Sequence, residues 1–364
     1  MNIAIDISPL TGNHSLQHRV RGSGYYLENL KTSLLQYYPQ HKYTFFTRGQ
    51  KIPKNIDLVH YPYFEPFFLT LPLFSKVRTI VTVHDLIPFV FPRHFSGGLK
   101  GNIKWQIQKV SLKNTNAIIT DSESSKQDII RFTGIKNSKI HVIYLAPGEG
   151  FTRFKDTSNK IRMKTQHFRK KYKLPDKFVL YVGDVTWNKN LPRLIESVKK
   201  ANIPLVMAGK ALIEKNVDLS NPWNKDFAKV LDLIERDNNI IRMGFISSEE
   251  LVMLYNVATV FAMPSLYEGF GLPVLEAMSS GCPVVTARTG SLQEIAGESA
   301  FYVDPYDIDS ISDGLKKVFF DQSVQKELIE KGLKQVKKFT WEKTVRETIN
   351  VYRYVSGFAK AYNF

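Results

Sequence analysis

Short apolar runs alternate with helix-like segments along all 364 residues, and this alternation restricts the fold more than any other feature. The runs are rich in Val and Ile, which is typical of strands buried on both faces of a parallel sheet. Six are predicted in the first half of the chain, at residues 3–7, 43–47, 57–60, 79–83, 117–120 and 140–143. Six more are predicted in the second half, at residues 178–182, 204–208, 240–243, 258–263, 283–286 and 300–303.

Two successive sets of six strands predict an α/β chain with two Rossmann-like, doubly wound domains that face each other across a cleft. The boundary should fall within residues 146–177, where Pro147-Gly148 and a basic, weakly apolar stretch come after the sixth strand. We therefore expect an N-terminal domain over 1–165, a C-terminal domain over 166–345, and a final helix over 346–364 that packs back on the first domain. Ligands of such folds bind beyond the carboxyl ends of the strands, so function should be found in the loops there.

The charge of the chain is unevenly distributed. It carries 50 Lys and Arg against 34 Asp and Glu, a formal net charge of +16. Residues 1–150 hold 18 basic and 9 acidic side chains, residues 151–177 hold 10 and 2, and residues 178–364 hold 22 and 23. A basic first half indicates an anionic partner: a nucleic acid, an acidic lipid surface or a phosphorylated substrate. Solvated lysines without a partner are the alternative.

Other features exclude several classes of protein. The single cysteine, Cys282, excludes a disulfide framework and is expected to be a small buried hydrophobe. The eight histidines show no zinc-ligand spacing. The N-terminus has no basic region before its short apolar run, and the longest apolar candidate, residues 67–74, is too short to span a membrane. We expect the protein in the cytoplasm, or peripheral to the inner face of the cell membrane.

The most informative loop is residues 264–278, PSLYEGFGLPVLEAM, which comes after a predicted strand. Gly269 and Gly271 allow the backbone to approach a ligand, and Pro273 suits the first position of a helix. The start of such a helix attracts an anion, most often a phosphate. Glu268 and Glu276 would repel that phosphate, so they are better suited to accept hydrogen bonds from sugar or ribose hydroxyls. A turn with a capping glutamate is the alternative.

These residues resemble a known family. Glu268 and Glu276, with seven residues between them, are similar to the E-x7-E signature of family 4 glycosyltransferases of the group 1 type. These are retaining, nucleotide-sugar-dependent enzymes with the two-domain GT-B fold. Four other elements resemble the family in the same order along the chain: Gly22-Ser23-Gly24-Tyr25, Thr82-Val83-His84-Asp85, Val182-Gly183 with Lys189-Asn190, and Asp304-Pro305.

The resemblance implies a role for each matching residue of the second domain. Glu268, with Phe270, Gly271 and Leu272, should surround the donor sugar and its phosphate, and Glu276 should hold the ribose. Lys189 should pair with the diphosphate and stabilise the charge that develops on the departing nucleotide. Many members place an arginine five residues before this lysine, but this chain has Asp184 there. Another basic residue is therefore needed if two cations hold the diphosphate.

In the first domain, His84 comes directly after a predicted strand, and the resemblance implies that it contacts the sugar or the transferred hydroxyl; a buried structural histidine is the alternative. Asp85 should orient the loop or cap the segment after it. Gly24 should let the backbone approach the diphosphate or the acceptor. Asp307-Ile308-Asp309 spells a metal-binding D-x-D, but Asp307 precedes a helical pattern and suits an N-cap. Members of the resembled family usually work without a metal ion, so the resemblance implies no metal ligands and a metal-independent enzyme without a bound cofactor.

The resemblance implies transfer of a hexose, mannose being favoured, from a GDP- or UDP-sugar to a hydroxyl of a glycan or lipid-linked saccharide. This would serve the synthesis of a cell-surface polysaccharide such as lipopolysaccharide. For the acceptor, residues 97–113 predict a basic amphipathic helix, either membrane-facing or core-facing, and residues 61–74 are rich in aromatics that could meet a lipid tail or fill the core. Contact with an anionic membrane is thus one expectation.

Three other classes of protein compete with this interpretation. A basic nucleic-acid-binding protein would explain the charge, but no recognisable module is present. A nicotinamide dehydrogenase would need a G-x-G-x-x-G turn, which the chain lacks. Another GT-B enzyme, an epimerase or a phosphorylase, remains an alternative. The sequence does not indicate an oligomeric state.

Overall fold

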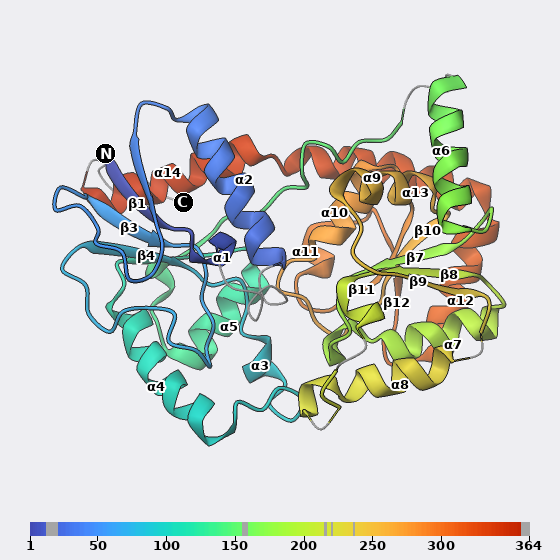
Figure 1. Ribbon diagram of the computed structural model, residues 1–364, viewed down its shortest axis with the longest axis horizontal. Helices are drawn as coiled ribbons and strands as arrows, with labels where there is room; N and C mark the ends of the chain where they lie inside the picture. The colour runs from blue at the N-terminus through green and yellow to red at the C-terminus, as the bar shows by residue number, and fades with distance from the viewer. Residues whose placement is uncertain (12–20, 155–158, 215–216, 220, 236, 358–364) are drawn as a thin grey trace. The chain divides into compact units, whose positions relative to one another are not determined.

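The computed structural model describes residues 1–11, 21–154, 159–214, 217–219, 221–235 and 237–357 (Figure 1). The chain forms two compact units. Unit 1 holds Met1–Ala146 together with the C-terminal segment from Phe339, and unit 2 holds Pro147–Lys338.

Unit 1 is built on a six-stranded parallel sheet of order β2-β1-β3-β4-β5-β6. Its strands are β1 (Asn2–Asp6), β2 (Lys42–Phe46), β3 (Leu58–Tyr61), β4 (Arg78–Thr82), β5 (Ala117–Thr120) and β6 (Ile140–Val142). Its helices are α1 (Ser8–Thr11), α2 (Arg21–Tyr37), α3 (Ile87–Val90), α4 (Gly98–Asn114), α5 (Glu123–Thr133), the short 3-10 turn η2 (Asn137–Lys139) and α14 (Trp341–Ser356).

Unit 2 is built on a second six-stranded parallel sheet of order β12-β11-β10-β7-β8-β9. Its strands are β7 (Val179–Val182), β8 (Leu205–Ala208), β9 (Ile240–Met243), β10 (Val260–Met263), β11 (Val284–Ala287) and β12 (Phe301–Val303). Its α-helices are α6 (Asn159–Tyr172), α7 (Leu191–Ala201), α8 (Lys225–Ile234), α9 (Ser248–Val257), α10 (Leu272–Ser279), α11 (Leu292–Ala296), α12 (Ile308–Phe320) and α13 (Gln322–Gln335). Its 3-10 turns are η3 (Trp187–Lys189), η4 (Lys210–Ile213), η5 (Pro222–Asn224) and η6 (Val336–Lys338).

The predicted fold class is confirmed, because all twelve predicted strands are present within two residues of their expected ends. The apolar runs are continuous because alternate residues of each strand face two different cores. On β7, Leu180 packs with residues of α6, α9 and α10, whereas Val179 and Tyr181 pack with residues of α7, α8 and α12. Cys282 is buried in the first of these cores, as expected.

The units divide at other positions than the expected 165 and 345. Residue 165 lies inside α6, whose Phe168 is buried in the core of unit 2, and residue 345 lies inside α14. A helix is one packed element, so each division falls in the segment before the helix, at Ala146/Pro147 and at Lys338/Phe339. Within unit 1, α14 packs along α2 (Figure 1).

Candidate active site

The strand order of unit 2 reverses between β7 and β10, and the loops after these two strands hold the main predicted site residues. At such a switch point the flanking connections leave in opposite directions, which opens a crevice at the carboxyl ends of the strands. Lys189 lies at the end of the loop after β7, and Glu268 lies in the loop after β10. The topology therefore brings together two residues that are 79 positions apart in the sequence.

Two asparagines hold these loops against each other. The Asn188 side chain donates to the Tyr267 carbonyl (3.0 Å), and the Leu266 amide donates to the Asn188 carbonyl (2.7 Å). Asn190 has a positive φ of 59° and donates to the carbonyls of Pro264 (2.9 Å) and Pro305 (2.6 Å). Both asparagines are buried, so these hydrogen bonds give their side-chain amides partners within the protein.

Lys189 and Glu268 form an ion pair at the centre of this arrangement. The lysine Nζ lies 2.7 Å from Oε2 and 2.9 Å from Oε1 of the carboxylate. The Glu268 side chain is 7% exposed and that of Lys189 is 20% exposed. The pair is thus largely shielded from water, where charge–charge interactions are stronger than at an open surface.

Helix α10 begins directly after the Glu268 loop, at Leu272, so Pro273 occupies its second position and not the expected first. The N-cap is Gly271, which has no side chain to cap the helix and adopts φ +94°. This left-handed backbone favours glycine, and a Cβ there would also lie 2.8 Å from Leu292 Cδ2, so that side chain would have to shift. The buried Phe270 precedes it.

A third loop, after β11, supports the Glu268 backbone. The Ser291 hydroxyl donates to the carbonyls of Glu268 (3.1 Å) and Phe270 (2.8 Å), and the Ser291 amide donates to the Glu268 carbonyl as well (3.1 Å). Gly290 has φ +54°, and a Cβ on it would lie 2.5 Å from the Glu268 carbonyl oxygen. These contacts and the close approach of the Gly290 backbone fix the backbone of Glu268, and with it the position of the Glu268 Cα.

Glu276 lies one turn into α10, but its carboxylate contacts α9. The Tyr255 hydroxyl donates to Glu276 Oε2 over 3.0 Å, and both side chains are buried. Burial raises the pKa of Glu276 to about 7, and the hydrogen bond from Tyr255 only partly offsets this. The group is therefore close to half-protonated at neutral pH.

Asp184, which stands where many family members have arginine, lies directly after Gly183 at the start of the β7 loop. Its carbonyl accepts a hydrogen bond from the Tyr181 hydroxyl (2.6 Å). Burial, with the charges of Glu268 and Asp184 adding to it, raises the pKa of Tyr181 well above its ordinary value. Tyr181 is thus a neutral donor that fixes the backbone at this position.

In unit 1, His84 lies just after β4 and meets a carboxylate that was not among the predicted site residues. Its Nδ1 lies 2.6 Å from Oδ2 of Asp121, which comes directly after the neighbouring strand β5. Burial opposes protonation of the ring, but the charge and hydrogen bond of Asp121, aided by the charge of Asp85, outweigh it and raise the pKa of His84. The ring is therefore oriented by Asp121, which also raises the pKa of His84 above its ordinary value.

A buried chain of polar groups lies beside this pair. His60 accepts or donates at both ring nitrogens, to the Tyr352 hydroxyl (2.7 Å) and to the Thr82 hydroxyl (2.9 Å), and Tyr26 contacts Thr82 over 3.1 Å. Burial, with the charge of His84 adding to it, lowers the pKa of His60 to about 3, so the ring is neutral. These hydrogen-bonded side chains connect α14 and α2 to Thr82 at the end of β4, two residues before His84.

The remaining predicted features lie in both units. Gly24 is buried in the first turns of α2, so the segment Gly22–Tyr25 is helical and not a loop. The Asp85 carboxylate accepts from the Ile87 amide (3.0 Å), which fits the expected orienting role. Asp307 is the N-cap of α12 and accepts from the Asp309 amide, as expected.

Among the described residues, no three His, Cys, Asp or Glu side chains are grouped so as to hold a metal ion, and no helix is long and apolar enough to cross a membrane.

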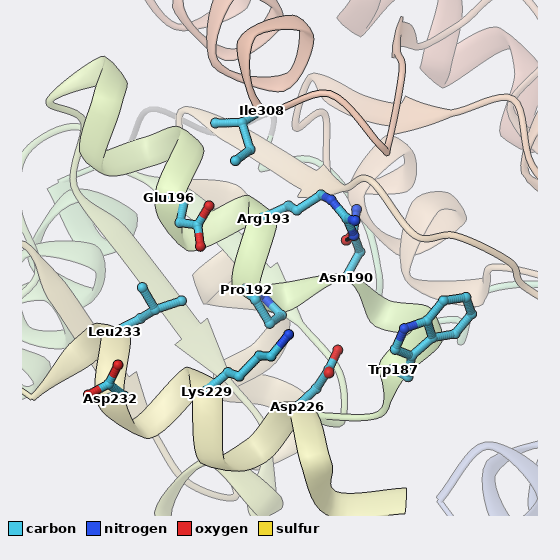
Figure 2. Close-up of a pocket in the computed structure, with 10 residues that line it drawn as sticks. All are labelled: Trp187, Asn190, Pro192, Arg193, Glu196, Asp226, Lys229, Asp232, Leu233 and Ile308. Carbon is cyan, nitrogen blue, oxygen red and sulfur yellow. Dashed lines mark hydrogen bonds between the residues drawn. The ribbon is translucent and has the colours of Figure 1, made fainter. Parts of the chain in front are cut away.

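A pocket of about 380 Å³ lies between α7 and α8 (Figure 2). Trp187 and Asn190, on either side of Lys189, form one wall, but none of the predicted site residues lines it. Its charged lining combines Arg193 and Lys229 with three carboxylates, those of Glu196, Asp226 and Asp232. This balance does not suit a diphosphate, so the Lys189–Glu268 pair remains the candidate site.

Asp121, Asn188, Tyr255 and Ser291 were not predicted from the sequence. Asp121 could have been found, because it comes after the buried run Ala117–Thr120 and the carboxyl ends of neighbouring parallel strands share one edge. Tyr255 and Ser291 gave no such signal, since their partners lie on other elements.

Comparison with known proteins places both units in described families. Residues 163–335 match the family model for glycosyl transferases group 1, and residues 11–146 match the model for glycosyltransferase family 4. The chain is 30% identical over 288 residues to O-antigen chain mannosyltransferase B of Escherichia coli. This alignment covers 76% of the present chain and 70% of the mannosyltransferase. It is 29% identical over 282 residues to the serotype-specific mannosyltransferase WbdA of the same organism, covering 75% of this chain but only a third (33%) of WbdA.

Among solved structures, HepE of Anabaena in complex with UDP and glucose aligns with a TM-score of 0.69. The alignment covers 96% of this chain and 98% of HepE at 16% sequence identity, so it shows a shared GT-B fold.

Proposed function

Because the chain belongs to family 4 of the glycosyltransferases, as a group 1 glycosyl transferase with the GT-B fold, we propose that it moves a hexose, with mannose favoured, from a nucleoside diphosphate sugar to a glycan. The acceptor would be a hydroxyl of a glycan or lipid-linked saccharide in the synthesis of a cell-surface polysaccharide. The names of the Escherichia coli relatives support mannose and O-antigen-type chains. The donor would be a GDP- or UDP-sugar, and the UDP bound to HepE supports a UDP-sugar.

The observation that carries this proposal is the shielded ion pair of Lys189 and Glu268 at the switch point of unit 2. Each residue of this ion pair can instead contact a group of the nucleotide-sugar donor. The diphosphate offers anionic oxygens to Lys189, and the hexose offers hydroxyls to Glu268. We infer that donor binding exchanges the internal ion pair for these two contacts, so that Lys189 meets the charge that builds up on the departing phosphate.

The remaining residues extend the donor site. The start of α10, at Gly271 and Leu272, directs backbone amides and the positive end of the helix dipole outward, which suits a phosphate. Glu276 would accept hydrogen bonds from the ribose, and these are stronger when its carboxyl group is ionised. His84, oriented by Asp121 in unit 1, would donate to the sugar or to the acceptor hydroxyl.

We propose that transfer retains the anomeric configuration of the donor. The glycosidic bond to the diphosphate breaks, the acceptor hydroxyl attacks from the same face, and its proton passes to the leaving phosphate oxygen. In this course the protein supplies orientation and charge stabilisation, and no side chain serves as nucleophile. We expect no metal ion to be required. The reaction would take place on the cytoplasmic side, with a lipid-linked acceptor presented at the inner face of the membrane.

The test begins with the donor. Thermal shift with GDP, UDP, ADP and dTDP identifies the base, and hydrolysis of the matching nucleotide sugars, including GDP-mannose and UDP-glucose, identifies the sugar. The anomeric configuration of the product is read by NMR. The proposal fails if none of the nucleotides stabilises the protein and none of the donors is hydrolysed.

Variants test the site itself. Lys189→Ala and Glu268→Ala should each lower turnover at least ~100-fold, the scale of losing one preorganised contact. Lys200→Ala is the matched control, because Lys200 also forms an ion pair, with Asp309, but both side chains are exposed. Turnover near the wild-type rate in both site variants would refute the assignment.

A further inference from the structure

Helix α4 of unit 1 carries a row of large apolar side chains that lie open to solvent. The row has i, i+4, i+8 and i+11 spacing, so its members share one face of the helix. Their exposed fractions are 80% for Leu99, 57% for Ile103, 37% for Ile107 and 46% for Val110. Single exposed leucines are common on proteins, but a contiguous row on one helix is typical of an interaction surface.

The opposite face of α4 makes the packing contacts of the helix. Trp105 and Leu112 are buried there, and the Gln108 side-chain oxygen accepts from the amides of Thr70 and Leu71. At 3.6 residues per turn, the centres of the two faces lie roughly 165° apart. The core-facing interpretation of the row is therefore wrong: unit 1 packs on the other face, and within the described residues the row itself stays open.

Lysines flank the exposed row on both sides. On the helical wheel, Lys100 and Lys104 lie on one side of it, and Lys109 and Lys113 on the other. The whole segment 66–120 contains seven Lys and Arg residues and a single acidic residue, Asp85. The surface is thus apolar along its middle and positively charged along both borders.

The loop before β4 continues this surface. Leu73 is 42% exposed and Phe74 is 76% exposed, and the Leu73 carbonyl accepts from the Asn114 side chain at the end of α4 (3.3 Å). By contrast, Phe67 of the same loop is buried and lies against Gly97, the N-cap of α4, and Gly101 in its first turn. The aromatic segment 61–74 therefore divides, with one part filling the core and its end facing solvent. Figure 1 shows α4 at the outer edge of unit 1.

We propose that this face of α4, with Leu73 and Phe74, is a docking surface for an anionic phospholipid bilayer. The helix would lie in the plane of the interface, with its apolar row among the acyl chains and its lysines among the phosphates. Charge decides between this partner and a second copy of the chain. A two-fold contact through this row would bring the lysine borders of two copies together, and like charges would repel.

The proposal deepens the proposed function and rests on it, because a lipid-linked acceptor is the reason for a membrane contact. Its test, however, needs no donor or acceptor. Binding of the full-length protein is measured by flotation with vesicles of phosphatidylglycerol and phosphatidylcholine, and with vesicles of phosphatidylcholine alone, at low and high salt. Donor hydrolysis is measured separately in solution, so each proposal can fail without the other.

Four variants make the test specific. Leu99→Ser/Ile103→Ser removes part of the row, and Lys100→Gln/Lys109→Gln removes one lysine from each border. Leu35→Ser/Phe320→Ser removes two exposed apolar side chains elsewhere (46% and 63% exposed), and Lys51→Gln/Lys54→Gln removes two exposed lysines elsewhere in unit 1. Thermal unfolding confirms that each variant is folded.

We expect the wild type to bind the anionic vesicles better than the neutral ones and to lose affinity at high salt. The row variant should lose affinity about 10-fold or more. The lysine variant should lose about 25-fold at low salt, at about five-fold for each of its two lysines near an anionic surface. The two control variants should bind like the wild type. Equal binding to both vesicles, equal losses in the controls, or a wild-type dimer in light scattering that the row variant abolishes would overturn the proposal.

Discussion

Glu276 provides a test that links the site to stability. It is buried in α10 and receives a hydrogen bond from Tyr255, and its pKa is raised from 4.5 to about 7. A raised pKa in the folded state means that ionisation of this carboxyl group opposes folding. Between the two pKa values, the free-energy cost of folding with an ionised Glu276 grows by about 1.4 kcal/mol for each pH unit. It reaches about 3 kcal/mol above pH 7.

The perturbation is Glu276→Gln, which keeps an acceptor for Tyr255 but removes the ionisable group. Below the unfolded pKa of 4.5, the difference in stability between wild type and variant should not change with pH, because Glu276 is protonated in both states of the wild type. As the pH rises from 4.5 to about 7, the wild type loses stability that the variant keeps, and above pH 7 the difference levels off. For a unit of this size, the gap of about 3 kcal/mol corresponds to roughly 6–12 °C in Tm.

The assay is differential scanning calorimetry of both proteins across this pH range, with the transition of unit 2 measured separately. Glu330→Gln is the matched control, because Glu330 is exposed on α13. Donor nucleotide is then added: if Glu276 accepts from the ribose as a carboxylate, nucleotide should stabilise the wild type more at pH 8 than at pH 6. A gap between wild type and Glu276→Gln that stays constant with pH would refute the reasoning.

Contacts in the two units lead to three further predictions. Gly290→Ala should destabilise unit 2 by about 1–3 kcal/mol in denaturant unfolding, because the new Cβ would lie 2.5 Å from the Glu268 carbonyl oxygen. Gly134→Ala is the control: Gly134 also has a positive φ (+71°) but open space around it, so this change should cost only about 1 kcal/mol. Asp121→Asn should lower the pKa of His84 in an NMR titration. The stabilisation that Asp121 gives the wild type should be lost as the pH rises through the pKa of His84 in the folded protein. An unchanged titration would mean that Asp121 does not raise the pKa of His84. Tyr352→Phe should destabilise unit 1 by about 1–3 kcal/mol, since it leaves a buried nitrogen of His60 without its partner, and an unchanged melting curve would contradict this.

The sequence determined the elements of this protein because their signals are local. Each buried strand had to be a short continuous apolar run, so runs such as Ala117–Thr120 and Ile240–Met243 could be placed to within two residues. The spacing of Glu268 and Glu276 and the position of Lys189 could also be recognised from the sequence, since each motif lies within one loop or at the start of one helix.

The relations between elements could not be decided from the sequence. Nothing local shows that Lys189 and Glu268, 79 residues apart, form an ion pair, since the reversal of strand order between β7 and β10 creates that contact. The raised pKa of Glu276 likewise depends on burial against α9. The helical pattern of residues 97–113 fitted two opposite orientations, and only the packing of Trp105 and Leu112 showed which face stays open. Strand pairing and burial are properties of the whole chain, and for that reason only the tertiary structure settled them.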